Sequence, residues 1–185
     1  MPAVDIQQRK FAHASDHKNL SAALATALAA SVCALAILSA GTSPVAADSL
    51  SRSIDVEGTP AAVWSAIGPF CAIQDWLPPI GTCVEDGKTP PTRTLVTRDG
   101  AATFVETQTA RNDARHFYSY AFRSSPMPVT HYNSTIEVTA KGQGNSTITW
   151  SSTYTPDRGK EKEATDTLSR VYESGLNAIK ARFAK

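Results

Sequence analysis

Glu106 is the residue best placed for acid–base chemistry in this 185-residue chain. It lies in the segment ATFVETQTA. If Phe104 of that segment points inward, Glu106 and Gln108 do too, because side chains of a strand repeat their direction every second residue. Burial raises the pKa of a carboxyl group and suits it to act as a general acid or base. Hydroxyl groups that could stabilise an enolate are available from Tyr118, Tyr120, Tyr132 and Tyr154.

A structural role for Glu106 is the favoured alternative. A half-buried glutamate commonly pairs with an arginine, here Arg93 or Arg123, and structural ion pairs perturb pKa values much as catalytic sites do. Tyrosines on the inner face of a sheet commonly fill space and form local hydrogen bonds. Glu106 is therefore kept as a catalytic candidate, with an ion pair as its expected role.

Other catalytic or cofactor sites are not indicated. After residue 47 the chain has two histidines, His116 and His131, and neither has a serine or cysteine partner at a spacing typical of a nucleophilic triad. His131 is out of phase with the inward residues of its segment and should face solvent. Asp75 is the only metal-binding residue type between Cys71 and Cys83, and no glycine-rich loop precedes a helix. We expect no metal and no nucleotide cofactor.

Alternation of apolar and polar residues predicts seven strands, each with one buried face. The segments are SLSRSIDVE, GTCVED, TRTLVTR, ATFVETQTA, HFYSYAFRS, THYNSTIEVTA and STITWSSTY. Between the first and the second, Thr59 and Pro60 supply an N-cap and a first-turn proline for a short helix, and FCAIQDW predicts a second short turn. In the last segment, the apolar residues recur at helical spacing. This predicted helix opens at Asp157–Gly159 and runs to about Phe183.

The order of these elements predicts an α+β fold in a single domain, residues 48–185. Two short helices follow the first strand, so that strand cannot pair with the second by a simple hairpin. It can join the sheet at the far edge instead. The expected result is a seven-stranded curved antiparallel sheet wrapped around the long C-terminal helix.

The chain resembles the START-related SRPBCC superfamily, and within it the bacterial polyketide cyclase/dehydrase and lipid-transport branch. The matching segments include TPAAVWSAIGPF, FCAIQDWLPPIGTCVEDG, RHFYSYAFRSSPMPVTHYNSTIEV, TITWSSTYTP and VYESGLNAIK, and the resemblance covers residues 49–185. It implies the helix-grip fold. Relatives often have Trp-His-Pro where this chain has Trp76, Leu77 and Pro78, and the lost polar group makes histidine-assisted chemistry less expected.

The resemblance also implies an internal cavity that binds a small hydrophobic or lipid-like molecule. The expected cavity wall is Trp76, Phe104, Glu106, Gln108, Tyr118, Tyr120, Phe122, Met127, Tyr132, Trp150, Tyr154, Leu168, Tyr172 and Leu176. A solid aromatic core is the alternative. Two other functions stay open: a polyketide cyclase/dehydrase-like enzyme using Glu106, and a periplasmic accessory protein to an oxidation system, which an exposed Trp64 would favour.

The first 47 residues have the pattern of a signal peptide. Arg9, Lys10 and Lys18 precede an Ala-rich apolar run, and the small residues Val45 and Ala47 predict cleavage after Ala47. A retained membrane anchor is the alternative. Cleavage removes three of the 18 Lys and Arg and two of the 17 Asp and Glu, so 15 of each remain. A net charge near zero, with no basic cluster, argues against nucleic acid as a partner and gives no reason to expect attraction to anionic membranes.

Cys71 and Cys83 are the two cysteines that follow the cleavage site. In an exported protein such a pair commonly forms a structural disulfide, and the spacing differs from the C-x-x-C of redox enzymes. Two buried free thiols and a metal site are the alternatives. We expect a periplasmic or secreted protein with one disulfide.

Overall fold

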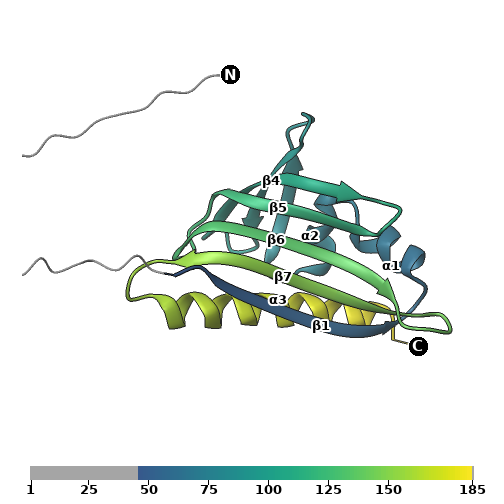
Figure 1. The fold of residues 1–185 in the computed structure, drawn as a ribbon. Helices are drawn as coiled ribbons and strands as arrows, with labels where there is room; N and C mark the ends of the chain where they lie inside the picture. The colour runs from purple at the N-terminus through teal and green to yellow at the C-terminus, as the bar shows by residue number, and fades with distance from the viewer. Residues whose placement is uncertain (1–45, 185) are drawn as a thin grey trace, which may run out of the picture. The chain divides into compact units, whose positions relative to one another are not determined.

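Seven antiparallel strands form one curved sheet in the computed structural model, which describes residues 46–184. The strand order is β1-β7-β6-β5-β4-β3-β2 (Figure 1). The strands are β1 (Asp48–Glu57), β2 (Ile80–Glu85), β3 (Thr92–Thr97), β4 (Thr103–Asn112), β5 (Phe117–Ser124), β6 (Val129–Ala140) and β7 (Asn145–Pro156). The predicted α+β helix-grip fold is confirmed, because the sheet carries short helices after its first strand and a long helix at its end.

β1 pairs with β7, the last strand in the sequence, and not with β2. The expectation that the first strand joins the far edge is therefore confirmed. Leu50 lies opposite Ser152 and Ile54 lies opposite Ile148, which places the apolar residues of β1 on the inner face.

The short helices after β1 begin and end at the residues that the sequence indicates. In α1 (Pro60–Ile67), the Thr59 hydroxyl accepts a hydrogen bond from the Ala62 amide, and Pro60 occupies the first turn. α1 ends at Gly68, where a Cβ would lie 2.6 Å from the Trp64 side chain. A 3₁₀ turn, η1 (Phe70–Ala72), and the helix α2 (Ile73–Trp76) follow. The predicted disulfide is present, and it joins Cys71 of η1 to Cys83 of β2.

α3 (Glu161–Arg182) lies along the sheet and buries one stripe of side chains. The stripe follows the helical period and contains Ala164, Leu168, Tyr172, Gly175, Leu176 and Ile179. Gly175 allows the helix to approach closely, because a Cβ at this position would lie 2.9 Å from the Trp150 ring and 3.0 Å from Leu77. The helix ends one residue before Phe183, close to the predicted end.

The interior has two parts of different composition. One, the aliphatic half, lies where α1 and the last turns of α3 cover the sheet (Figure 1). It contains Val56, Val63, Ile67, Val138, Ile148 and Ile179, all of them 4% exposed or less. The other, the aromatic half, contains Tyr120, Phe122, Tyr132, Trp150 and Tyr172, and it lies between β4 to β7, α2 and the middle of α3.

The predicted signal segment lies outside the described residues except for its last two. Within residues 46–184, no helix combines the length and the apolar character needed to cross a membrane.

Candidate ligand-binding cavity

A cavity of about 90 Å³ lies in the aromatic half, between the inner face of the sheet, the α2–β2 segment and α3. Its wall is almost entirely apolar. The lining residues are Ile73, Leu77, Pro79, Ile80, Leu95, Thr97, Phe104, Glu106, Tyr120, Phe122, Tyr132, Trp150, Leu168, Val171 and Tyr172. Among these described residues, Glu106 alone carries a formal charge at neutral pH.

The mouth of the cavity lies where its lining residues reach solvent. Pro79 is exposed, and Thr97, Phe104, Phe122 and Val171 are partly exposed. The remaining lining residues are buried, so the cavity is closed toward the centre of the sheet. The mouth is thus framed by the α2–β2 segment, β3, β4, β5 and α3.

Eight of the fourteen predicted wall residues line this cavity. They are Phe104, Glu106, Tyr120, Phe122, Tyr132, Trp150, Leu168 and Tyr172. Strand and helix periodicity identified them, because each lies on the inner face of its element.

The other six predicted wall residues lie elsewhere: Trp76, Gln108, Tyr118, Met127, Tyr154 and Leu176. Trp76 is behind the wall, with its ring edge-on to Trp150 at 5.4 Å between centroids. Tyr118 contacts the rings of Trp64 and Phe70, and the Tyr154 hydroxyl is hydrogen-bonded to Thr165 at 2.9 Å. The inner face of the sheet is longer than the cavity, so inward direction alone does not place a residue in its wall.

Seven lining residues were missed by the sequence prediction: Ile73, Leu77, Pro79, Ile80, Leu95, Thr97 and Val171. The alternation of TRTLVTR indicated that Leu95 and Thr97 share a face, and Val171 belongs to the apolar stripe of the helix. The four residues from the α2–β2 segment follow no period, so the sequence held no signal for them.

Glu106 forms a buried ion pair with Arg93. Arg93 Nε donates to Glu106 Oε2 at 2.6 Å, and the side chains of Arg93 and Glu106 are 0% and 5% exposed. The two residues lie directly opposite each other on β3 and β4. Arg123, the other expected partner, donates instead to the Thr107 hydroxyl. The structural role that was favoured for Glu106 is present, although the same side chain also faces the cavity.

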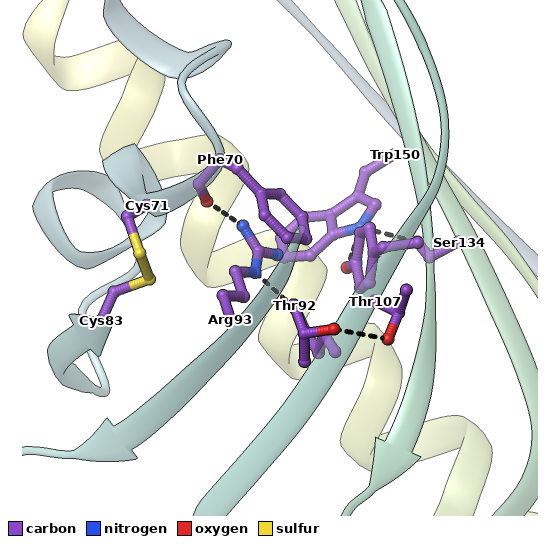
Figure 2. Close-up of polar contacts among 10 residues, drawn as sticks. Phe70, Cys71, Cys83, Thr92, Arg93, Thr107, Ser134 and Trp150 are labelled. Atoms are coloured by element: carbon purple, nitrogen blue, oxygen red, sulfur yellow. Dashed lines mark hydrogen bonds and ion pairs between the residues drawn. A yellow bond between two sulfur atoms is a disulfide. The ribbon is translucent and has the colours of Figure 1, made fainter. Parts of the chain in front are cut away.

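Arg93 is held from several sides (Figure 2). Its Nη1 donates to the Phe70 carbonyl, and its guanidinium lies 4.0 Å from the centroid of the Phe70 ring and 5.0 Å from that of Tyr120. Cation–π contacts of this kind favour a desolvated guanidinium. Arg93 therefore links η1, which carries the disulfide, to the cavity wall.

Burial raises the pKa of the Glu106 carboxyl, while the Arg93 guanidinium opposes that rise. Burial is the largest single effect on the pKa of Arg93 and acts to lower it, but Glu106, Tyr118 and Tyr120 together outweigh burial and raise that pKa above its ordinary value. Because a guanidinium keeps its proton in proteins, the 2.6 Å contact favours the carboxylate form of Glu106.

A hydrogen-bonded network closes the inner end of the cavity. Trp150 Nε1 donates to the hydroxyls of Ser134 at 2.9 Å and Tyr120 at 3.1 Å. The Tyr172 hydroxyl lies 2.6 Å from that of Tyr132 and 3.1 Å from that of Ser134. The Trp150 and Tyr172 rings are stacked at 4.2 Å between centroids. Burial raises the pKa values of Tyr120 and Tyr132 well above the ordinary value, so these hydroxyls stay protonated.

The remaining candidate residues lie away from the cavity. His131 is exposed, as expected, and His116 is partly buried beside Trp64. Trp64 is 7% exposed and donates to Asp113 at 2.9 Å, so the exposed surface that an accessory role would favour is not present at this residue. Within the described part of the chain, no group of three or more His, Cys, Asp or Glu side chains could hold a metal ion.

Comparison with known proteins gives a family and several similar structures. The family described as "Polyketide cyclase / dehydrase and lipid transport" matches residues 47–184. The protein XoxI from Bacillus cereus is 33% identical with a TM-score of 0.69, over 73% of this chain and 94% of that one. An uncharacterised protein from Bacillus thuringiensis is 32% identical with a TM-score of 0.70, over 74% of this chain and 98% of that one.

More distant structures share the fold alone. The aromatase/cyclase Zhui from Streptomyces sp. R1128 is 17% identical with a TM-score of 0.59, over 74% of this chain and 93% of that chain. A search of curated proteins gave no significant match.

Proposed function

The chain belongs to the polyketide cyclase/dehydrase and lipid-transport family of SRPBCC proteins, and from this premise we propose that it binds a small hydrophobic molecule in the cavity of the aromatic half. The observation that supports binding most strongly is the composition of the wall. Aromatic and aliphatic side chains supply nearly all of it, and Glu106 adds a single charged group. Ligand sites are commonly apolar with a few placed polar groups that fix orientation.

The cavity volume limits the part of the ligand that can be buried. An engineered protein cavity of about 150 Å³ holds benzene. The present cavity of about 90 Å³ is smaller, so a bound ring requires side chains at the mouth to move. Phe104 is partly exposed there, and its ring is tilted against that of Phe122 with 6.0 Å between the centroids, so Phe104 is the side chain best placed to move. We infer that the protein buries one ring-sized group, and that any longer part of the ligand projects through the mouth.

Catalysis by Glu106 is the second candidate function. Its position in the cavity wall favours this function, and members of the same fold include an aromatase/cyclase. The Arg93 ion pair opposes it, since the pairing stabilises the carboxylate and makes it a poorer base. For this reason we place binding first.

We also propose that the protein is exported and cleaved after Ala47, which would place it in the periplasm or outside the cell. The Cys71–Cys83 disulfide supports this, because such bonds persist in oxidising compartments. Intact mass of the protein from its own host should correspond to an N-terminus at or near Asp48. A full-length, membrane-retained product would support the anchor alternative.

Native mass spectrometry of protein purified from its own host tests ligand binding. The expected result is a non-covalent small-molecule adduct that denaturation releases. Val171→Trp should abolish the adduct, because Val171 lines the mouth. Arg170→Trp, one residue away on the exposed side of α3, is the matched control and should retain it. Protein without any adduct, or an adduct equally abundant in both variants, would contradict binding in this cavity.

A further inference from the structure

Two polar groups in the cavity wall keep hydrogen-bonding capacity that no described residue uses. The first is Glu106 Oε1. Arg93 occupies only Oε2, and Oε1 accepts no hydrogen bond within residues 46–184. The buried side-chain atoms there that lack a partner are Trp76 Nε1, Arg93 Nη2 and Ser152 Oγ. Glu106 Oε1 also has no partner, but it is not among these fully buried atoms. It is therefore accessible from the open space of the cavity.

The second group is the Tyr120 hydroxyl. It accepts from Trp150 Nε1 at 3.1 Å, and this is its one hydrogen bond to the described residues. A phenolic hydroxyl that accepts can also donate. Its proton is retained, since burial raises the pKa of Tyr120 well above the ordinary value. The Tyr120 proton is therefore available to a molecule in the cavity, which Tyr120 lines.

The acceptor and the donor come from neighbouring strands, and both residues line the same cavity. Glu106 and Gln108 are successive inward residues of β4, and Tyr120 is opposite Gln108 on β5. Arg93 contacts both groups, with its Nε on Glu106 and its guanidinium 5.0 Å from the Tyr120 ring. The cavity thus has one polar corner, while the opposite walls come from Leu77, Leu168 and Val171.

We propose that Glu106 and Tyr120 select a ligand whose buried ring carries a hydroxyl group, as in a phenol. The ligand hydroxyl donates to Glu106 Oε1 and accepts from the Tyr120 hydroxyl, so both groups are satisfied. A ligand with a carboxylate in this corner is disfavoured, because a carboxylate has no proton to donate to Glu106 Oε1. A cationic ligand gains little, because Arg93 already neutralises Glu106. This inference rests on the proposed function, since it names the ligand class for the same cavity.

Phenol and fluorobenzene are matched probes, because they have nearly the same size and differ in the hydroxyl group. Titration of the mature protein followed by NMR gives the dissociation constant of each. Wild type should bind phenol about ten-fold more tightly or better, since a hydrogen bond to a charged group contributes about 1.5–3 kcal/mol. Tyr120→Phe should weaken phenol about three- to ten-fold and leave fluorobenzene unchanged. Tyr154→Phe removes a buried hydroxyl outside the cavity and should change neither affinity.

Glu106→Gln is the second test, because it replaces the free carboxylate oxygen by an amide group of the same shape. It should reduce the preference for phenol over fluorobenzene to about that of an apolar cavity. If Glu106→Gln fails to fold, the Tyr120→Phe result still decides. Equal binding of the two probes by wild type, or an unchanged preference in Tyr120→Phe, would overturn the hydroxyl proposal while leaving the cavity as a binding site. Binding of neither probe would overturn the proposed function itself.

Discussion

The aliphatic and aromatic halves share one sheet and one helix, yet the first is solid and the second is hollow. In the aliphatic half, Ile67, Ile148 and Ile179 are 0% exposed, and none of them lines the cavity. In the aromatic half, stacked rings such as Phe122 and Tyr132, 3.9 Å apart, surround the cavity. Branched aliphatic side chains can interdigitate and fill space. Planar rings held by stacking and by hydrogen bonds cannot turn to fill a gap, so the gap remains.

The hydrogen bonds of the aromatic half explain why it does not collapse. Moving the Trp150 ring into the cavity would break its bonds to Ser134 and Tyr120. Each buried donor or acceptor left without a partner costs about 1–3 kcal/mol. The polar network therefore preserves the cavity.

The largest expected effect comes from breaking the ion pair in the cavity wall. Arg93→Met leaves the Glu106 carboxylate buried without a partner, and the free energy of unfolding should fall by about 3–5 kcal/mol. The double variant Arg93→Met, Glu106→Leu should recover most of that loss, because it removes both charges. Urea unfolding measures both. A loss below about 1 kcal/mol, typical of an exposed pair, would show that this part of the wall is open to water.

A pair of truncations compares the two halves directly. Ile148→Ala in the aliphatic half should cost about 3–4 kcal/mol, in the upper half of the 2–5 kcal/mol range for buried aliphatic residues. Leu168→Ala should fall near the bottom of that range. Leu168 lines the cavity, so fewer contacts are lost on truncation. Equal costs in urea unfolding would mean that the aromatic half is packed as tightly as the other.

Removing the disulfide should lower the free energy of unfolding by a smaller amount. Its structural effect should be limited to the aromatic half. The disulfide joins residues 12 apart in the sequence and closes the segment that supplies Ile73, Leu77, Pro79 and Ile80 to the cavity. The chain-entropy model gives about 3 kcal/mol for a loop of this size. Reduction should destabilise the protein by about that amount and broaden the methyl signals of Ile73 and Leu77, with Ile148 unaffected.

The double variant Cys71→Ser, Cys83→Ser is the control for the reductant. Its stability should match that of the reduced wild type and should not change when reductant is added. Uniform broadening across both halves after reduction would indicate global loosening and contradict a local role of the disulfide.

Alkaline pH should lower the free energy of unfolding gradually, because the interior contains several buried tyrosines. Burial raises the pKa values of Tyr118, Tyr120, Tyr132 and Tyr172 in the folded state, whereas tyrosine in the unfolded chain ionises near pH 10. Above about pH 10 the unfolded state therefore binds fewer protons than the folded state, and stability falls as pH rises. Each such tyrosine contributes a slope of up to about 1.4 kcal/mol per pH unit. Urea unfolding at several pH values above 9, with Tyr132→Phe as a shallower control, measures the slope.

The fold could be predicted because its elements have clear periods and ends. Alternation identified the inward residues Tyr120, Tyr132 and Trp150, and helical spacing identified Leu168 and Tyr172. Thr59 and Pro60 marked the start of α1. These signals are local, so they can be recognised without knowing which strands are neighbours.

The cavity could be predicted only in part, because a void depends on how distant elements fit together. The choice of Arg93 over Arg123 as partner of Glu106 follows from the β3–β4 register, which no local pattern specifies. Tyr154 and Tyr118 point inward as predicted, but they contact Thr165 and Phe70 outside the cavity. Pro79 lines it from the turn before β2, and Ile80 lines it from the first position of that strand, where no period had yet begun.

Methyl NMR of residues 48–185 titrated with benzene is the most direct test of a hollow aromatic half beside a solid aliphatic half. We predict saturable shifts of the methyl signals of Ile73, Leu77 and Leu168, which line the cavity. The signals of Val138, Ile148 and Ile179 in the aliphatic half should stay in place. An absence of saturable shifts, or shifts of equal size in both halves, would contradict the account.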